Sequence, residues 1–176
     1  MIIIQMTGMS GAGKSSIAES TKDMLVQEGY RVEILDGDEY RLNLCSDLGF
    51  SKEDRNQNIR RLGFVAKVLA RNGTIAIIAA INPYEQLRRE VADSWGNVKT
   101  VYVKCPIPVL KDRDTKNLYH RASLPDNHPE KINNLTGISD PFEKPPEPDL
   151  VLNTDIETVK DSANRLKKFI KNNISS

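Results

Sequence analysis

The chain has 176 residues, with 25 Lys and Arg against 24 Asp and Glu and a formal net charge of +1. This length suits one domain with a hydrophobic core, so we expect a single domain over residues 1–176. The near-neutral charge argues against nucleic acid as a partner, and no apolar run approaches the roughly 20 residues that span a bilayer. The apolar opening lacks the basic segment of a signal peptide, so we expect it to be a core strand of a cytoplasmic protein.

Strand and helix patterns alternate from the first residues onward. The run at 74–81 is almost uninterrupted in its apolar residues, as expected for a strand buried on both faces of a parallel sheet. The segment 52–71 repeats apolar residues at helical spacing. In chain order, the pattern predicts a strand at 2–6, a helix at 14–28, a strand at 31–35, a helix at 52–71, a strand at 74–81, a helix at 84–94, a strand at 99–104, a strand at 150–153 and a helix at 156–170.

These elements predict an α/β fold, a doubly wound five-stranded parallel sheet. In such sheets ligands bind beyond the carboxyl ends of the strands. The stretch 113–149 carries most of the prolines and shows little periodicity. Because long connections without structure are usually functional, we expect this stretch to be a mobile lid over the site.

A glycine-rich motif lies between the first expected strand and the first expected helix. Gly8 to Ser15 fits the pattern G-x-x-x-x-G-K-[ST] without a mismatch. In this phosphate loop the backbone N–H groups face phosphate oxygens, Lys14 adds a positive charge and Ser15 offers a hydroxyl to Mg²⁺. A glycine-rich turn that matches by chance is the alternative, and the position between strand and helix argues against it. The residues expected to bind ATP here are Gly8, Ser10, Gly11, Ala12, Gly13, Lys14, Ser15 and Ser16.

The positions of the acidic residues narrow the class of phosphate-loop protein. The chain has no Asn-Lys-x-Asp motif, which a GTPase needs to recognise guanine. The strand at 74–81 ends without the acidic residue that energy-coupling ATPases carry there. Asp36 and Asp38 instead follow the second expected strand, where a small-molecule kinase needs a metal partner and a base. The sequence therefore indicates a kinase.

Further motifs resemble the adenylylsulfate kinase family, in one consistent order from Gly8 to about Thr154. The resemblance implies a P-loop kinase that transfers the ATP γ-phosphate to the ribose 3′-hydroxyl of a nucleotide bearing a mixed anhydride. It also implies ATP and Mg²⁺ as cofactors, a lid and a homodimer. The motifs that carry the resemblance are Asp36-Gly37-Asp38, Arg41, Asn43, Asp47 to Ser51, Asp54-Arg55, Asn58 to Arg61, Pro83-Tyr84, Arg113-Asp114, Lys116, Leu118-Tyr119, Thr136 to Ile138 and Asp140-Pro141.

The resemblance and the chemistry together suggest roles for individual residues. Lys14, Asp36 and Asp38 are the catalytic candidates: Asp38 as base or orienting group for the hydroxyl, and Asp36 with Ser15 at the metal. The two aspartates could exchange roles, and an acidic turn that caps the next helix is the alternative for both. The resemblance implies that Arg113 lies over the ATP adenine. The residues expected to bind the acceptor substrate are Arg41, Phe50, Arg55, Asn58, Ile81, Asn82, Lys116 and Leu135.

Three positions on the acceptor side depart from the family pattern. Leu135 stands where the family has a Phe that stacks on adenine, and Asn82 and Glu85 stand where it has Ser and Arg. Loss of an aromatic ring weakens stacking on a purine, and Glu85 removes a positive charge. A branch of the family phosphorylates cytidine diphosphoramidate in the biosynthesis of capsule phosphoramidate, and its smaller base and neutral amide would suit Leu135 and Asn82. From the resemblance to this branch we expect cytidine diphosphoramidate as the acceptor. The alternative is adenylylsulfate in sulfate assimilation, and a nucleotide-binding regulatory protein is the alternative from another functional class.

Overall fold

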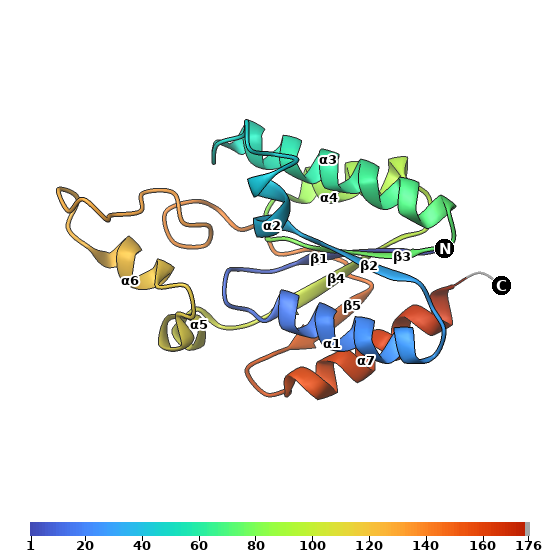
Figure 1. Cartoon of the computed structure of the whole chain (residues 1–176). Coiled ribbons are helices and arrows are strands. Elements are labelled where there is room, and N and C mark those ends of the chain that lie inside the picture. Colours follow the sequence, from blue (N-terminus) through green and yellow to red (C-terminus); the bar gives the residue numbers. More distant parts are fainter. Residues whose placement is uncertain (175–176) are drawn as a thin grey trace.

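A parallel sheet with strand order β2-β3-β1-β4-β5 organises the protein, and helices cover both of its faces (Figure 1). The computed structural model describes residues 1–174. The strands are β1 (Ile3–Thr7), β2 (Val32–Asp36), β3 (Ile75–Ala79), β4 (Val98–Lys104) and β5 (Leu150–Asn153). The helices are α1 (Lys14–Gln27), α2 (Gly37–Leu42), α3 (Lys52–Arg71), α4 (Glu85–Ser94), α5 (Ile107–Arg113), α6 (Leu118–Ser123) and α7 (Val159–Asn173).

The sheet separates two hydrophobic clusters, because successive side chains of a strand point to opposite faces. Ile2, Ile4 and Met6 belong to the cluster under α1 and α7, whereas Ile3 belongs to the cluster under α3 and α4. Every residue of β1 and of β3 is buried. This confirms the predicted doubly wound sheet of P-loop kinase type, with strands buried on both faces.

The strand ends bring distant parts of the sequence together at one edge of the sheet. β1 pairs with both β3 and β4, and β2 pairs with β3, all in parallel. The segments that follow β1, β2, β3 and β4 therefore meet at the same edge. This is the edge where the sequence predicts a ligand site.

Between β4 and β5 the chain leaves the sheet as a long projection (Figure 1). We call residues 113–149, the expected lid, the arm. It contains α6, and α5 leads into it; neither these helices nor α2 were expected from the sequence. All three have only six or seven residues, too few for a helical period to be recognised. Within residues 1–174 no helix is long and apolar enough to cross a membrane.

Candidate active site

A cavity of about 650 Å³ lies at the carboxyl ends of the strands, between the phosphate loop, α2, α3 and the arm. Its size falls in the usual range for small-molecule sites. Of the predicted site residues, only Gly8, Ala12 and Arg113 lie outside its lining. The predicted residues that line it are Ser10, Gly11, Gly13, Lys14, Ser15, Ser16, Asp36, Asp38, Arg41, Phe50, Arg55, Asn58, Ile81, Asn82, Lys116 and Leu135.

Lys14 is held inside the phosphate loop. Its Nζ donates to the carbonyl oxygens of Gly8 (2.8 Å) and Met9 (2.9 Å), and the side chain is buried. The pKa of Lys14 is lowered from 10.5 to about 8, chiefly by burial and then by the nearby charge of Lys116, while Asp38 and Asp36 oppose the shift. An anion beside this ammonium group would restore its ordinary pKa. The loop therefore holds a cation that gains from binding phosphate.

Gly8 explains why the loop lies so close to the sheet. A Cβ atom at this position would lie 2.5 Å from the carbonyl oxygen of Val103 in β4, so no larger residue fits without movement. Ala12 is buried, and its carbonyl accepts a hydrogen bond from the Thr154 hydroxyl. Gly8 and Ala12 thus fix the loop on the sheet, while their neighbours face the cavity.

Asp36 links the end of β2 to the start of α1. Its Oδ1 accepts hydrogen bonds from the backbone N–H groups of Asp38 (2.9 Å) and Glu39 (3.4 Å), which caps α2. Its Oδ2 accepts a hydrogen bond from Ser15 Oγ at 2.6 Å. The same carboxylate therefore caps α2 and lies beside Ser15 at the phosphate loop, so the two roles considered as alternatives from the sequence are compatible.

The Ser15 and Asp36 oxygens fit Mg²⁺. This hard cation is held in kinases by one or two protein oxygens, with phosphate oxygens and water completing six ligands. One hydroxyl and one carboxylate oxygen, side by side at the phosphate loop, are such a pair. Residues 1–174 contain no group of three or more His, Cys, Asp and Glu side chains suited to hold a metal by protein ligands alone.

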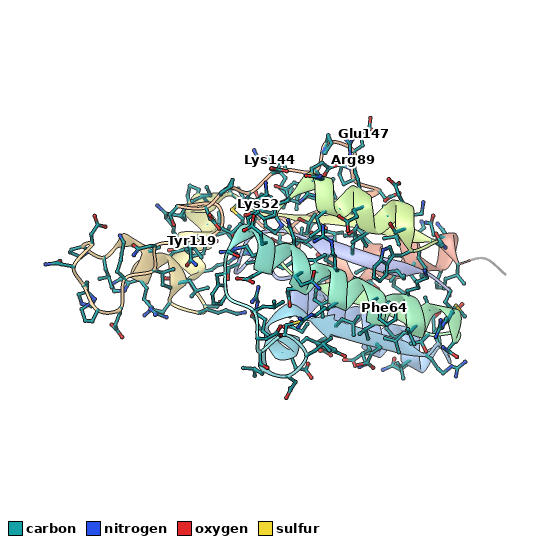
Figure 2. The ribbon with its side chains drawn as sticks, turned by 90° about the horizontal axis from the view of Figure 1, so that it is seen from above. Lys52, Phe64, Arg89, Tyr119, Lys144 and Glu147 are labelled. Carbon is teal, nitrogen blue, oxygen red and sulfur yellow. The ribbon has the colours of Figure 1, made fainter. Side chains whose placement is uncertain are left out.

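Two contacts join the arm to the phosphate loop and to the predicted base. Lys116 forms an ion pair with Asp38, and both side chains are more than half exposed. Tyr119 in α6 is buried and donates from its hydroxyl to the carbonyl oxygen of Ser10 (2.8 Å). In Figure 2 Tyr119 lies where the arm meets the body of the molecule. The arm thus contacts both the phosphate loop and the predicted base.

Two arginines surround the exposed ring of Phe50. The Arg41 guanidinium lies 4.7 Å and that of Arg55 5.8 Å from the ring centroid, within the range of cation–π attraction. Burial lowers the pKa of Arg41, and the positive charge of Arg55 adds to the effect. Arg55 is also buried, with bonds to the Phe50 and Asn134 carbonyls and an ion pair with Asp140. It therefore ties α3 to the arm as well as lining the cavity.

Asn58 and Asn82 each bury a side-chain carbonyl oxygen that has no hydrogen-bond partner among the described residues. Both side chains lie in the cavity wall. A buried, unpaired acceptor costs about 1–3 kcal/mol, so each oxygen needs a donor from a ligand or from water. Leu135 lies in the same wall and packs into the hydrophobic cluster of α1 and α7.

Arg113 lies at the base of the arm, where its guanidinium donates to the Thr154 carbonyl oxygen. The sequence reasoning also missed several residues of the lining, most of them in the arm. Their segment shows no periodicity, so the sequence carried no signal that they face inward. The missed residues are Gly37, Ile59, Ala79, Ala80, Pro83, Thr115, Leu118, Arg121, Ile132, Asn134 and Thr136.

Comparison with known proteins places this geometry in a family. The family described as adenylylsulphate kinase matches residues 1–153. A protein of Microcystis aeruginosa named adenylyl-sulfate kinase is 47% identical over 161 residues, covering 92% of this chain and 86% of that protein. The APS kinase CysC of Mycobacterium tuberculosis, in complex with AMPPNP and APS, superposes with a TM-score of 0.88 at 35% identity, covering 96% of each chain. A hexameric APS kinase of Thiobacillus denitrificans gives a TM-score of 0.70 at 30% identity, covering 97% of this chain and 29% of that one.

These relatives overturn the acceptor expected from the sequence. The prediction of cytidine diphosphoramidate, and of the capsule role that depended on it, is wrong, because the similar proteins found in sequence and in structure are named as adenylyl-sulfate kinases. The structure shows one reason for the error. Glu85 lies outside the cavity lining and forms ion pairs with Arg88 (2.9 Å) and Arg89 (2.8 Å), so its charge is compensated away from the site. The chain belongs to the adenylylsulphate kinase family of phosphotransferases.

Proposed function

We propose that the protein transfers the γ-phosphate of ATP to the ribose 3′-hydroxyl of adenylylsulfate. The observation that carries the proposal is that one cavity is lined both by the phosphate loop and by Arg41, Phe50 and Asn58. A donor nucleotide on the loop and an acceptor nucleotide on the opposite wall would meet there. Most of phosphoryl-transfer catalysis lies in such positioning and in charge neutralisation.

The phosphate loop and α1 form the donor side. Lys14 moves from the carbonyls of its own loop to the phosphates of ATP, because the ammonium gains more from an anion than from neutral oxygens. Ser15 and Asp36 would hold Mg²⁺, which would neutralise charge on the transferring phosphate. Arg113 contacts the ATP adenine from the base of the arm.

Arg41, Phe50 and Arg55 form the acceptor side. Phe50 offers an exposed ring on which the adenine stacks, and stacking of this kind contributes about 1–3 kcal/mol per base. The two arginines supply positive charge and planar donor groups for the sulfate and phosphate oxygens. Asn58 and Asn82 accept hydrogen bonds from the sugar or base through their unpaired oxygens. Ile81 and Leu135 add apolar contacts.

Asp38 acts as the base. Both oxygens of Asp36 already accept hydrogen bonds, whereas the Asp38 carboxylate is bound by Lys116 alone among the described residues. When phosphate draws Lys116 away, this carboxylate is free to accept the proton of the 3′-hydroxyl. The 3′-oxygen then bonds to the γ-phosphorus as the bond to the β,γ-bridging oxygen breaks. Lys116 neutralises the charge that develops on the transferring group.

The experiment is a comparison of ATP consumption with and without adenylylsulfate. We expect turnover to rise by orders of magnitude when adenylylsulfate is added, with one new phosphate on the ribose of the product. ATP hydrolysis that no nucleotide anhydride stimulates would instead support a nucleotide-binding regulatory protein.

We also propose that the protein is a homodimer, as the family resemblance implies. Large apolar side chains of α2, α3 and the segment between them are exposed, among them Leu42, Leu44 and Phe64. Light scattering on the protein eluted from a size-exclusion column gives the mass of the assembly, and a monomer or a hexamer would contradict the proposal. The cytoplasmic location expected from the sequence stays a prediction.

A further inference from the structure

Arg88 in α4 is one of the largest fully buried side chains of the described residues, with 2% of its surface exposed. A buried guanidinium is costly unless its N–H groups are bonded. Here Nη1 donates to the Asn82 carbonyl (2.7 Å) and Nη2 to the Glu143 carbonyl (2.6 Å). Nε donates to the Glu85 carboxylate at 3.0 Å. One side chain thus binds the segment that follows β3, the start of α4 and the returning end of the arm.

The same three segments are bonded a second time without Arg88. The Glu143 N–H donates to the Pro83 carbonyl at 2.9 Å, and the Glu143 carboxylate accepts from the Glu85 N–H at 2.7 Å. The arm therefore returns to the sheet edge as a rigid unit with residues 82–85. We call residues 82–85, Arg88 and Glu143 the brace.

Asn82 connects the brace to the cavity. It has a left-handed backbone with φ of 45°, uncommon for a residue other than glycine, and its carbonyl accepts from Arg88 and Thr7. Its side-chain orientation is also fixed. Gln5 Nε2 donates to the Arg88 and Thr100 oxygens, so Gln5 Oε1 is left to accept from Asn82 Nδ2 at 3.2 Å.

These hydrogen bonds use Asn82 Nδ2 and the Asn82 backbone carbonyl, but not Asn82 Oδ1. The oxygen is buried, lies in the cavity wall and finds no donor within residues 1–174. A strained backbone with a fixed amide is the arrangement expected where a contact to a ligand must be held in place. The group it suits is a hydrogen-bond donor, such as a hydroxyl or amino group of the acceptor nucleotide.

We infer that Arg88 is a positioning residue for the acceptor substrate: through the brace it holds Asn82 so that Oδ1 accepts a hydrogen bond from that substrate. The inference rests on the proposed function for the identity of the acceptor. It assigns no role to Arg88 in binding ATP, because the hydrogen bonds of its guanidinium run to Asn82, Glu85 and Glu143 and not to the phosphate loop.

The first test uses Glu143, whose side chain is exposed, so that its removal spares the core. Glu143→Ala removes the bond to the Glu85 N–H, whereas Glu143→Gln keeps an oxygen that can accept it. Glu147→Ala is the matched control: it removes the same charge from the same segment, at a side chain that points outward in Figure 2. We expect Glu143→Ala to raise the KM for adenylylsulfate about fivefold, with the Kd for ADP unchanged. Glu143→Gln should restore the KM, and Glu147→Ala should match the parent.

Arg88→Lys is the second test, since it keeps the positive charge and loses the planar guanidinium group with its several N–H donors. We expect kcat/KM for adenylylsulfate to fall about tenfold or more, with ADP affinity within about twofold of the parent. If this variant does not fold, the Glu143 series decides alone. Equal losses for ADP and for adenylylsulfate, or Glu143→Ala behaving like Glu147→Ala, would overturn the inference.

A failure of the proposed function is distinguishable from a failure of the brace. If the parent shows no turnover dependent on adenylylsulfate, the proposed function fails and KM values cannot be measured. Hydrogen exchange of the Glu85 amide still reports on the brace, because this N–H is the donor to Glu143. Glu143→Ala should speed its exchange and Glu143→Gln should not; equal exchange in both would overturn the brace independently of any substrate.

Discussion

Raising the pH from 7 to 9 should weaken the binding of ADP, because Lys14 must carry its proton to bind phosphate. In the free protein burial lowers the pKa of Lys14 to about 8. Phosphate oxygens beside the ammonium raise the pKa again in the complex. The free pKa thus lies below the bound pKa. The affinity for ADP is therefore highest below the pKa of Lys14 in the free protein and declines as the pH rises through that value.

The size of the effect follows from the fraction of Lys14 that holds its proton. With a pKa of about 8, roughly nine in ten molecules are protonated at pH 7 and roughly one in eleven at pH 9. The Kd for ADP should therefore rise about tenfold between these two values. At pH 9, binding should take up close to one proton per molecule.

Isothermal titration calorimetry measures both quantities. Titrations at pH 9 in two buffers of different protonation enthalpy give the proton uptake, and titrations at pH 7 and pH 9 give the Kd values. Lys14→Met is the control, because its binding should be weak and independent of pH over this range. A parent Kd that stays constant from pH 7 to pH 9, with no proton uptake, would refute the reasoning about Lys14.

Three further predictions test the site and the fold. Asp38→Asn should lower kcat with adenylylsulfate by more than it changes the KM for ATP, because the shape stays and the base is lost; a change in the ATP KM alone would make Asp38 a metal ligand. Phe50→Ala should raise the KM for adenylylsulfate about tenfold through lost stacking, and an unchanged KM would mean that the adenine of adenylylsulfate does not stack on Phe50. Thr158→Ala should lower the free energy of unfolding in urea by about 1 kcal/mol, because the Thr158 hydroxyl accepts from the Asp161 N–H at the start of α7. Thr158→Ser keeps this cap and should match the parent.

The long elements could be predicted from the sequence because each has a period and a clear end. The helix predicted at 52–71 is α3, Lys52–Arg71, with the Ser51 side chain capping its start. The strand predicted at 150–153 is β5. The phosphate loop could be predicted for a different reason, since its glycines and lysine are fixed by the geometry of phosphate binding.

The brace could not be predicted, because it is built from tertiary contacts. Arg88 occupies a position on the buried stripe of α4 with Leu87 and Val91, and Gln5 is a lone polar residue in an apolar strand. Both were signals that a buried polar network was present. Neither showed which partners the network has, because Glu143 lies 55 residues from Arg88 in the chain. The reading of Glu85 as a change of charge at the acceptor failed for the same reason.

The arm is anchored at both ends, by Arg113 on the Thr154 carbonyl and by Glu143 on Pro83. A loop closed by fixed ends costs only about 0.6 kcal/mol more for each doubling of its length. Within the arm, the mostly exposed residues 125–130 form a smaller loop, closed by the Lys131 ammonium on the Leu124 carbonyl. Residues inserted or deleted there leave the contacts of Lys116, Tyr119 and Leu135 in place. Residues 125–130 are thus the part of this fold in which evolution can lengthen or shorten the chain at small thermodynamic cost.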